Sequence, residues 1–246
     1  MTDEKTAKLR KRFYKDVSVS PEGEAFNVLL DERTVKTPGK VSLSLKTREL
    51  ADGVAEEWNA QGEKINPFSM PLTQIACTAI DRVGPHRDET EVLVAKFAES
   101  DLVCYHAEAP IDLVKRQHDA WQPPLDWLAS EYGIKLTTTA TLIAVPQPDG
   151  SLVKFKELVA SFDDHELAAF AVLAQAMGSV VLGLSVARGF MTGEDAVAAA
   201  QIDETFQFER WGSDCEAEQR LRDLRDEVFD AERYLTLHCS KISETF

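Results

Sequence analysis

The chain contains one stretch of 21 residues without a charged side chain, which runs from Leu167 to Ala187. A stretch of this length satisfies the requirement for a helix that crosses a membrane. It is rich in alanine, however, and the pair Gly178-Ser179 interrupts it near the middle. Acidic residues flank its start, and no aromatic belt surrounds it. We therefore predict two short buried helices joined at this pair, and no membrane span.

Short runs of alternating apolar and polar side chains occupy the first 65 residues. Turn residues separate the runs, which lie at 13–19, 25–30, 34–37 and 41–45. Such spacing predicts an antiparallel meander. Thr47 then has the character of a helix cap, and Gly62 that of the stop signal. We expect a small antiparallel sheet with one helix packed on it.

Helical patterns replace the alternating runs after residue 65. Three of the helices are expected to begin beside proline, at Pro71, Pro85 and Pro110. The pair Pro123-Pro124 is expected to break the third helix and to start a fourth. The β-branched run 135–145 is the one strand-like segment of this half. We therefore predict an α+β fold with a small domain at 1–65 and a mainly helical domain, resembling an orthogonal bundle, at 66–246.

The last 55 residues contain two patterns typical of helix starts. Thr192-Gly-Glu-Asp195 and Ser213-Asp-Cys-Glu216 both match the capping box. The first helix is expected to continue to Trp211 and to stop at Gly212, and the second to reach about residue 238. This pattern predicts a helical hairpin with a partly exposed tryptophan at its elbow, where tryptophan is a candidate for recognition.

The net charge is −15, from 27 basic and 42 acidic residues with the histidines neutral. The segment from Glu194 to Glu232 contributes −9 of it, through thirteen acids and four arginines. Residues 1–15, by contrast, have six basic and two acidic side chains. An anionic chain is repelled by nucleic acid and by anionic membranes, so we expect neither as a partner. We predict an acidic surface on the hairpin and a basic N-terminal arm that binds this surface or a partner.

The cysteines and the first residues indicate the compartment. Four cysteines are far apart and form no CxxC motif, which predicts reduced thiols. The N-terminal residues show neither an apolar signal segment nor the pattern of a transit peptide. We expect a protein of the bacterial cytoplasm.

Catalytic signals are weak throughout the sequence. The patterns GxSxG, HExxH, GxxxxGK[ST] and GxGxxG do not occur. Cys104 and His106 could form a thiolate–imidazole pair or ligate a metal, but residues two apart on a helix point to different faces. Asp214, Glu216 and Glu218 could bind a metal or act as acid and base, although a helix start favours carboxylates for its dipole alone. We expect no cofactor and no metal, and a cysteine- or metal-dependent hydrolase stays as the alternative.

Several short segments, in this order, carry a resemblance to a known family. They are Val35-Lys-Thr-Pro38, Glu57-Trp58, Asn66-Pro-Phe-Ser-Met-Pro-Leu-Thr73, Thr78-Ala-Ile-Asp81, Asp101-Leu-Val-Cys-Tyr105, Gln207-Phe-Glu-Arg-Trp-Gly212 and Glu216-Ala-Glu218. Together they resemble the assembly chaperones of the F-type ATP synthase of the ATP-twelve type, over residues 12–235. The chain departs from the family pattern at Asp31-Glu-Arg33, where such proteins usually place a glycine in the turn.

The resemblance implies a function without catalysis. Proteins of this family hold the newly made alpha subunit before it pairs with beta, and they consist of a small α+β domain followed by a helical domain. The important acid of the family would fall in the Asp203-Glu204 pair, and we assign it to Glu204. Combined with the charge pattern, the resemblance gives an expected alpha-subunit site at Glu204, Gln207, Trp211, Asp214 and Glu216. We expect a monomer, and a regulatory scaffold for another protein is a third interpretation.

Overall fold

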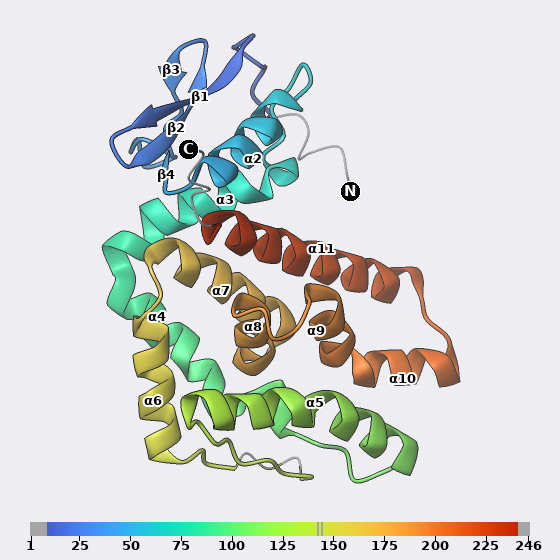
Figure 1. The fold of residues 1–246 in the computed structure, drawn as a ribbon. Coiled ribbons are helices and arrows are strands. Elements are labelled where there is room, and N and C mark those ends of the chain that lie inside the picture. The colour runs from blue at the N-terminus through green and yellow to red at the C-terminus, as the bar shows by residue number, and fades with distance from the viewer. Residues whose placement is uncertain (1–8, 142, 144, 241–246) are drawn as a thin grey trace. The chain divides into compact units, whose positions relative to one another are not determined.

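The computed structural model describes residues 9–141, 143 and 145–240 (Figure 1). A small antiparallel sheet and a mainly helical remainder confirm the expected fold class. The contacts divide the chain into two units: residues up to Pro85 with those from Arg233 onward, here the sheet unit, and His86–Glu232, here the helical unit. The boundaries between these units lie after Pro85 and before Arg233, whereas the predicted domain boundary lies after residue 65. The predicted boundary stays a prediction.

Strand β2 (Ala25–Leu30) is the centre of the sheet. Strand β1 (Val17–Glu22) pairs antiparallel with one of its edges, and β3 (Arg33–Thr34) and β4 (Ser44–Leu45) both pair antiparallel with the other. Residues 35–43 leave this edge as a small hairpin. The predicted strands and their antiparallel pairing are therefore confirmed, but the simple meander is wrong, because β3 and β4 follow one another along a single edge of β2.

A two-residue turn joins β2 to β3. Its residues Asp31 and Glu32 have φ angles of 47° and 67°, in the left-handed region that favours glycine. The Asp31 carboxylate accepts hydrogen bonds from the backbone N–H groups of Lys15 at 2.9 Å and Asp16 at 3.0 Å. These bonds lower the pKa of Asp31 and hold the turn without a glycine.

Two helices complete the core of the sheet unit. Helix α2 (Arg48–Asn59) begins at the expected cap, because the Thr47 hydroxyl accepts the N–H of Leu50. It ends three residues before Gly62, and the guanidinium of Arg12 donates to the Asn59 and Gln61 carbonyls at that end. Helix α3 (Pro71–Thr78) starts after Met70 and continues as a π-helical turn, Ala79–Val83.

Carboxylates link the family segments of the sheet unit. Glu57 of α2 accepts hydrogen bonds from the Leu72 and Thr73 N–H groups at 2.7 and 2.8 Å, and from the Thr73 hydroxyl at 2.7 Å. Asp81 accepts the Thr37 hydroxyl at 2.6 Å and the Gly39 N–H at 2.7 Å. A Cβ at Gly39 would lie 2.5 Å from an oxygen of Asp81, so this contact requires glycine.

Helices α7 (Asp164–Met177) and α8 (Val180–Ala187) form the core of the helical unit. Gly178 ends α7 with a φ of 63°, and the Ser179 hydroxyl caps α8 by accepting the N–H of Leu182. The predicted pair of buried helices is thus confirmed. Among the described residues, no helix is both long and apolar enough to span a membrane.

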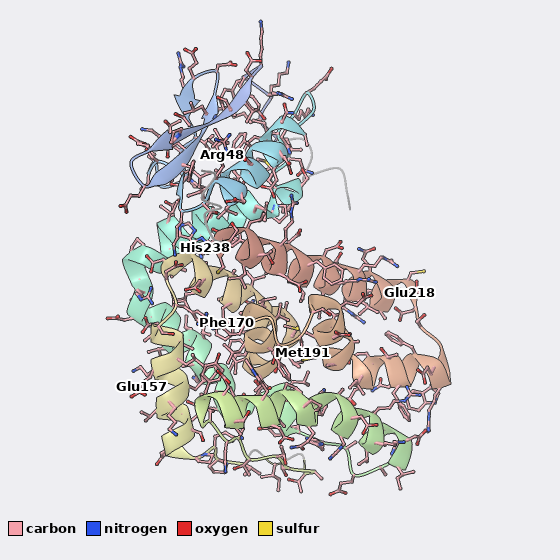
Figure 2. All side chains as sticks on the ribbon, viewed as in Figure 1. Arg48, Glu157, Phe170, Met191, Glu218 and His238 are labelled. Carbon is pink, nitrogen blue, oxygen red and sulfur yellow. The ribbon has the colours of Figure 1, made fainter. Side chains whose placement is uncertain are left out.

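Six further helices surround this pair. They are α4 (Arg87–Lys96), α5 (Ile111–Tyr132), α6 (Asp149–Ala160), α9 (Gly193–Ala200), α10 (Ile202–Trp211) and α11 (Cys215–His238), whose last turns belong to the sheet unit. Phe170 of α7 lies inside, whereas Glu157 and Glu218 are exposed (Figure 2).

Three predictions in this unit are wrong. Helix α5 continues through Pro123-Pro124, because loss of two N–H donors does not outweigh the tertiary packing of Pro124 and its buried neighbours. The predicted helix from Thr192 to Trp211 divides at Gln201 into α9 and α10. In the run 135–145, the described residues form no strand, only one bridge between Thr139 and Tyr105.

Candidate functional site

Helix α10 is fixed to α5 by polar contacts along one face. The Gln117 side chain donates to the Asp203 carboxylate at 2.6 Å. Both guanidinium nitrogens of Arg116 lie 2.8 Å from the Glu209 carboxylate. A third pair, Arg210 and Asp112 at 3.0 Å, completes the contact.

An aromatic ring lies beneath these ion pairs. Phe206 is the buried residue of α10. The guanidinium groups of Arg210 and Arg116 lie 4.2 and 5.4 Å from its ring centre, within the range of cation–π attraction. The inner face of α10 is therefore occupied, and the helix is held in a fixed rotation.

Three of the predicted site residues lie together on an adjacent face of α10, which is exposed. Glu204, Gln207 and Trp211 follow one another at positions i, i+3 and i+7, which share one side of a helix. All three are exposed, and the Trp211 side chain is 77% exposed. We call these residues the outer face of α10.

The other two predicted residues lie at the start of α11 and have local partners. Asp214 accepts the N–H of Ala217 at 2.7 Å, so it is the helix cap in place of the predicted Ser213. Glu216 forms an ion pair with Arg220 at 3.1 Å. Both acids are exposed, but helix capping and pairing within one helix account for their positions.

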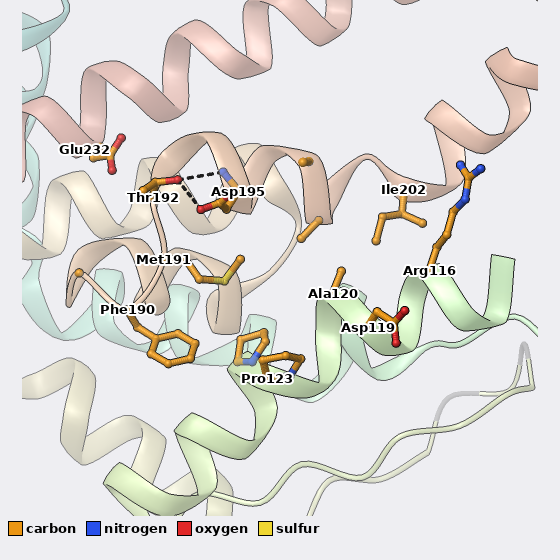
Figure 3. A pocket seen from close by; sticks show the side chains of 14 residues that line it. Arg116, Asp119, Ala120, Pro123, Phe190, Met191, Thr192, Asp195, Ile202 and Glu232 are labelled. Atoms are coloured by element: carbon orange, nitrogen blue, oxygen red, sulfur yellow. Dashed lines mark hydrogen bonds between the residues drawn. The ribbon is translucent and has the colours of Figure 1, made fainter. Parts of the chain in front are cut away.

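A pocket of about 910 Å³ lies between α5, the loop after α8, and α9 (Figure 3). Pro123, Phe190 and Met191 are among its apolar residues, and Phe190 stacks on Trp127 with 4.8 Å between ring centres. Because proline lacks an N–H, Pro123 and Pro124 cannot make the usual helical bonds to the carbonyls of Asp119 and Ala120, which line this pocket. The pocket was not predicted from the sequence, although the proline pair is a signal for it.

The candidate nucleophile lies in an unreactive position. Cys104 is buried, and burial together with the nearby Asp101 raises its pKa to about 12, which keeps the thiol protonated. The His106 ring contacts the carbonyl of Val103 at 3.2 Å and packs edge-on against Trp121. Burial lowers the pKa of His106. Neither group is prepared for nucleophilic catalysis.

The acids of α11 do not form a metal site either. Within the ranges described, no three His, Cys, Asp or Glu side chains are grouped so that they could hold a metal ion.

Asp101, from another family segment, has a structural role. Its carboxylate is fully buried and accepts hydrogen bonds from the Ser179 hydroxyl at 2.7 Å and from the N–H of Val181 at 3.1 Å, at the start of α8. It also accepts the N–H of Val103. Burial nevertheless raises its pKa to about 6.

An exposed tryptophan and an exposed carboxylate on one face of a fixed helix are features suited to binding another polypeptide. The comparisons agree with this class: the family model described as "ATP12 chaperone protein" matches residues 11–129. The chain belongs to the ATP12 chaperone family.

Solved structures extend the similarity over nearly the whole chain. The crystal structure of Atp12 from Paracoccus denitrificans is 41% identical, with a TM-score of 0.89, over 93% of this chain and 98% of that one; a point mutant of the same protein gives the same values. The Atu1473 protein from Agrobacterium tumefaciens is 36% identical, with a TM-score of 0.88, over 94% of this chain and 87% of that one. The mitochondrial protein atp12 of Schizosaccharomyces pombe is 25% identical over 215 residues, which are 82% of this chain and 74% of the relative.

Proposed function

We propose that this chaperone acts in the assembly of the F-type ATP synthase, where it holds the alpha subunit until that subunit pairs with beta. The observation that carries the proposal is the outer face of α10. Its tryptophan is 77% exposed on a helix that three polar contacts and a buried phenylalanine fix from behind. A large exposed aromatic ring on a rigid support is expensive to leave in water unless it serves recognition.

The chemistry of this face suits a holding function. An unassembled subunit exposes an apolar interface that tends to aggregate. A holder must cover this interface and later release it, which favours a modest apolar contact surrounded by polar groups. Trp211 supplies the apolar contact, and Gln207 and Glu204 supply the polar ones. No covalent step is required, so the proposed activity is binding alone.

The surrounding charge would guide the client. The segment from Glu194 to Glu232, which contains α10 and most of α11, has a net charge of −9. Such a surface accelerates encounters with basic patches and disfavours acidic partners. We propose that Asp214 and Glu216 contribute mainly through this field, since local partners hold both side chains.

A capture experiment tests the outer face. Glu204→Lys and Trp211→Ala are each expected to weaken binding of purified alpha subunit about tenfold or more, with unchanged circular dichroism. The matched control is Glu157→Lys on α6, which makes the same charge change at another exposed position and should retain capture. If both folded variants bind alpha as well as the wild type does, the outer face is not the site.

We propose further that the chain works as a monomer in a bacterial cytoplasm and without a cofactor. Sedimentation of the purified protein at micromolar concentration should give the mass of one chain, 27.4 kDa. A stable dimer would contradict the monomer.

A further inference from the structure

Two adjacent cavities of about 880 and 530 Å³ lie in the sheet unit. They share six lining residues: Arg10, Val35, Lys36, Trp58, Ile65 and Pro67. Because the shared residues include a tryptophan, we call the continuous depression the Trp58 groove. It consists entirely of sheet-unit residues and is separate from the outer face of α10.

We propose that the Trp58 groove is a second docking site, which takes an extended segment of a partner polypeptide with carboxylates beside an apolar side chain. This inference goes beyond the proposed function, because it concerns other residues in the other unit.

Four consecutive residues, 34–37, contribute to the lining of the groove before the turn at Pro38. Four residues in extended form measure about 13 Å, at about 3.3 Å per residue. We expect a guest of about four extended residues beside this stretch.

Its aromatic floor is held in place before any guest binds. The Tyr14 hydroxyl donates to the Trp58 carbonyl at 2.5 Å, and the two rings meet edge-on with 5.7 Å between centres. Phe13 packs edge-on against Tyr14 at 5.4 Å and is itself 54% exposed. Rigid aromatic surfaces bind apolar side chains at a small entropic cost.

The rim is cationic, although the whole chain has a net charge of −15. Arg10, Arg33 and Lys36 are exposed there, and none of them pairs with a carboxylate in the described part of the chain. The acid among the lining residues, Asp31, is occupied by the N–H groups of residues 15 and 16. The unpaired cations therefore favour a guest that carries carboxylates.

This charge pattern fits a peptide better than a nucleic acid. Three cations spread around an apolar floor match carboxylates that flank an apolar side chain. A nucleic acid has a phosphate at each nucleotide and is bound by rows of cations along its backbone, which the lining residues of this groove do not provide. Binding of an oligonucleotide is therefore an outcome that counts against the proposal.

Fluorescence anisotropy on the full chain tests the groove. The probe is a fluorescein-labelled, amidated peptide with the sequence DELPFED, and its counterpart KKLPFKK is the charge control. The wild type should bind DELPFED saturably. Lys36→Glu should weaken binding about tenfold, and Trp58→Phe about fivefold, because phenylalanine offers a smaller aromatic surface than tryptophan. Lys156→Glu, an exposed position on α6, makes the same charge change and should alter binding by less than about twofold.

Four results would overturn the proposal: no saturable binding of DELPFED, equal binding of KKLPFKK, equal effects of Lys36→Glu and Lys156→Glu, or tighter binding of a labelled oligo(dT). A dimer that Lys36→Glu dissociates would assign the groove to a second copy instead. Lys36 is exposed, so its variant should fold even if Trp58→Phe does not. The alpha subunit is absent from this assay, so failure here and failure of the proposed function are separable.

Discussion

The sheet unit and the helical unit divide the charge of the chain very unequally. The segments 1–85 and 233–246 contain 15 basic and 14 acidic residues, a net charge of +1. Residues 86–232 contain 12 basic and 28 acidic residues, a net charge of −16. The overall −15 is therefore a property of one unit. The net charge of the whole chain therefore does not show that the sheet unit is nearly neutral and the helical unit strongly acidic.

Both units contain the same kind of polar contact between separate segments of the chain. In each, a carboxylate from one segment accepts the N–H groups at the start of a helix far along the chain: Glu57 at α3, and Asp101 at α8. In the sheet unit the link joins α2 to the start of α3, and in the helical unit it joins Asp101 to the start of the buried helix α8. Removal of either carboxylate should leave backbone N–H groups without their acceptor.

The largest effect is expected at Glu57. Glu57→Ala leaves the N–H groups of Leu72 and Thr73 and the Thr73 hydroxyl without their acceptor, which should lower the free energy of unfolding by about 3–4 kcal/mol. Urea denaturation measures this loss, and hydrogen exchange at the α3 amides locates it. The adjacent Glu56 is exposed and pairs only with Arg233 in the contacts described, so Glu56→Ala should cost less than about 1 kcal/mol. If Glu57→Ala and Glu56→Ala lower the free energy of unfolding by similar amounts, the buried hydrogen bonds of Glu57 do not have the stabilising effect expected here.

Asp101 makes the helical unit sensitive to pH. Its folded pKa of about 6 lies above the ordinary value of 3.8, so between these values the folded state binds more proton than the unfolded state. The contribution of this group to the free energy of unfolding should therefore be highest below about pH 4 and should fall by about 2–3 kcal/mol in total as the pH rises to 6. Above pH 6 it should stay constant.

Asp101→Asn isolates this contribution. The amide does not titrate, so the stability difference between wild type and variant should change between pH 4 and pH 7, in the direction that favours the wild type at low pH. Urea denaturation at the two values measures it. A difference that is constant with pH would mean that burial does not perturb this carboxyl.

The smallest effect is expected at the turn between β2 and β3. Glu32→Gly removes the strain of a side chain at a φ of 67°. Glycine also gives the unfolded chain more conformational entropy, which offsets part of the gain, so the free energy of unfolding should rise by at most about 0.5–1 kcal/mol. Thermal denaturation of both proteins measures the gain. A loss of stability would show that the Glu32 side chain supports the turn by some other contact.

Local signals predicted much of this fold because local chemistry determines them. Thr47 caps α2 as expected, and Gly178 ends α7 in the left-handed conformation. The continuity of α5 through Pro123-Pro124 and the break at Gln201 depend on tertiary packing, which no local pattern reports. The run 135–145 shows the same limit, since β-branched residues form strands only where a partner strand is available.

The candidate site was predictable in part. The exposure of Trp211 is confirmed, because a helix stop flanked by charge favours a position in solvent. The separation of the outer face from the inner contacts of Asp203, Glu209 and Arg210 was not predictable, since it depends on the way in which α10 lies on α5. Two of the six basic residues of the predicted N-terminal arm, Lys5 and Lys8, fall outside the described residues. The other four lie in the sheet unit, where Arg12 donates to carbonyls at the end of α2. The Trp58 groove assembles residues from four separate segments, and no spacing in the sequence indicates it.

Light scattering of refolding alpha subunit tests the central claim most directly. We predict that an equimolar amount of this chain suppresses aggregation, that Glu157→Lys does so equally, and that Glu204→Lys and Trp211→Ala do not. Aggregation at the same rate with and without the wild-type chain would contradict the proposed holding function.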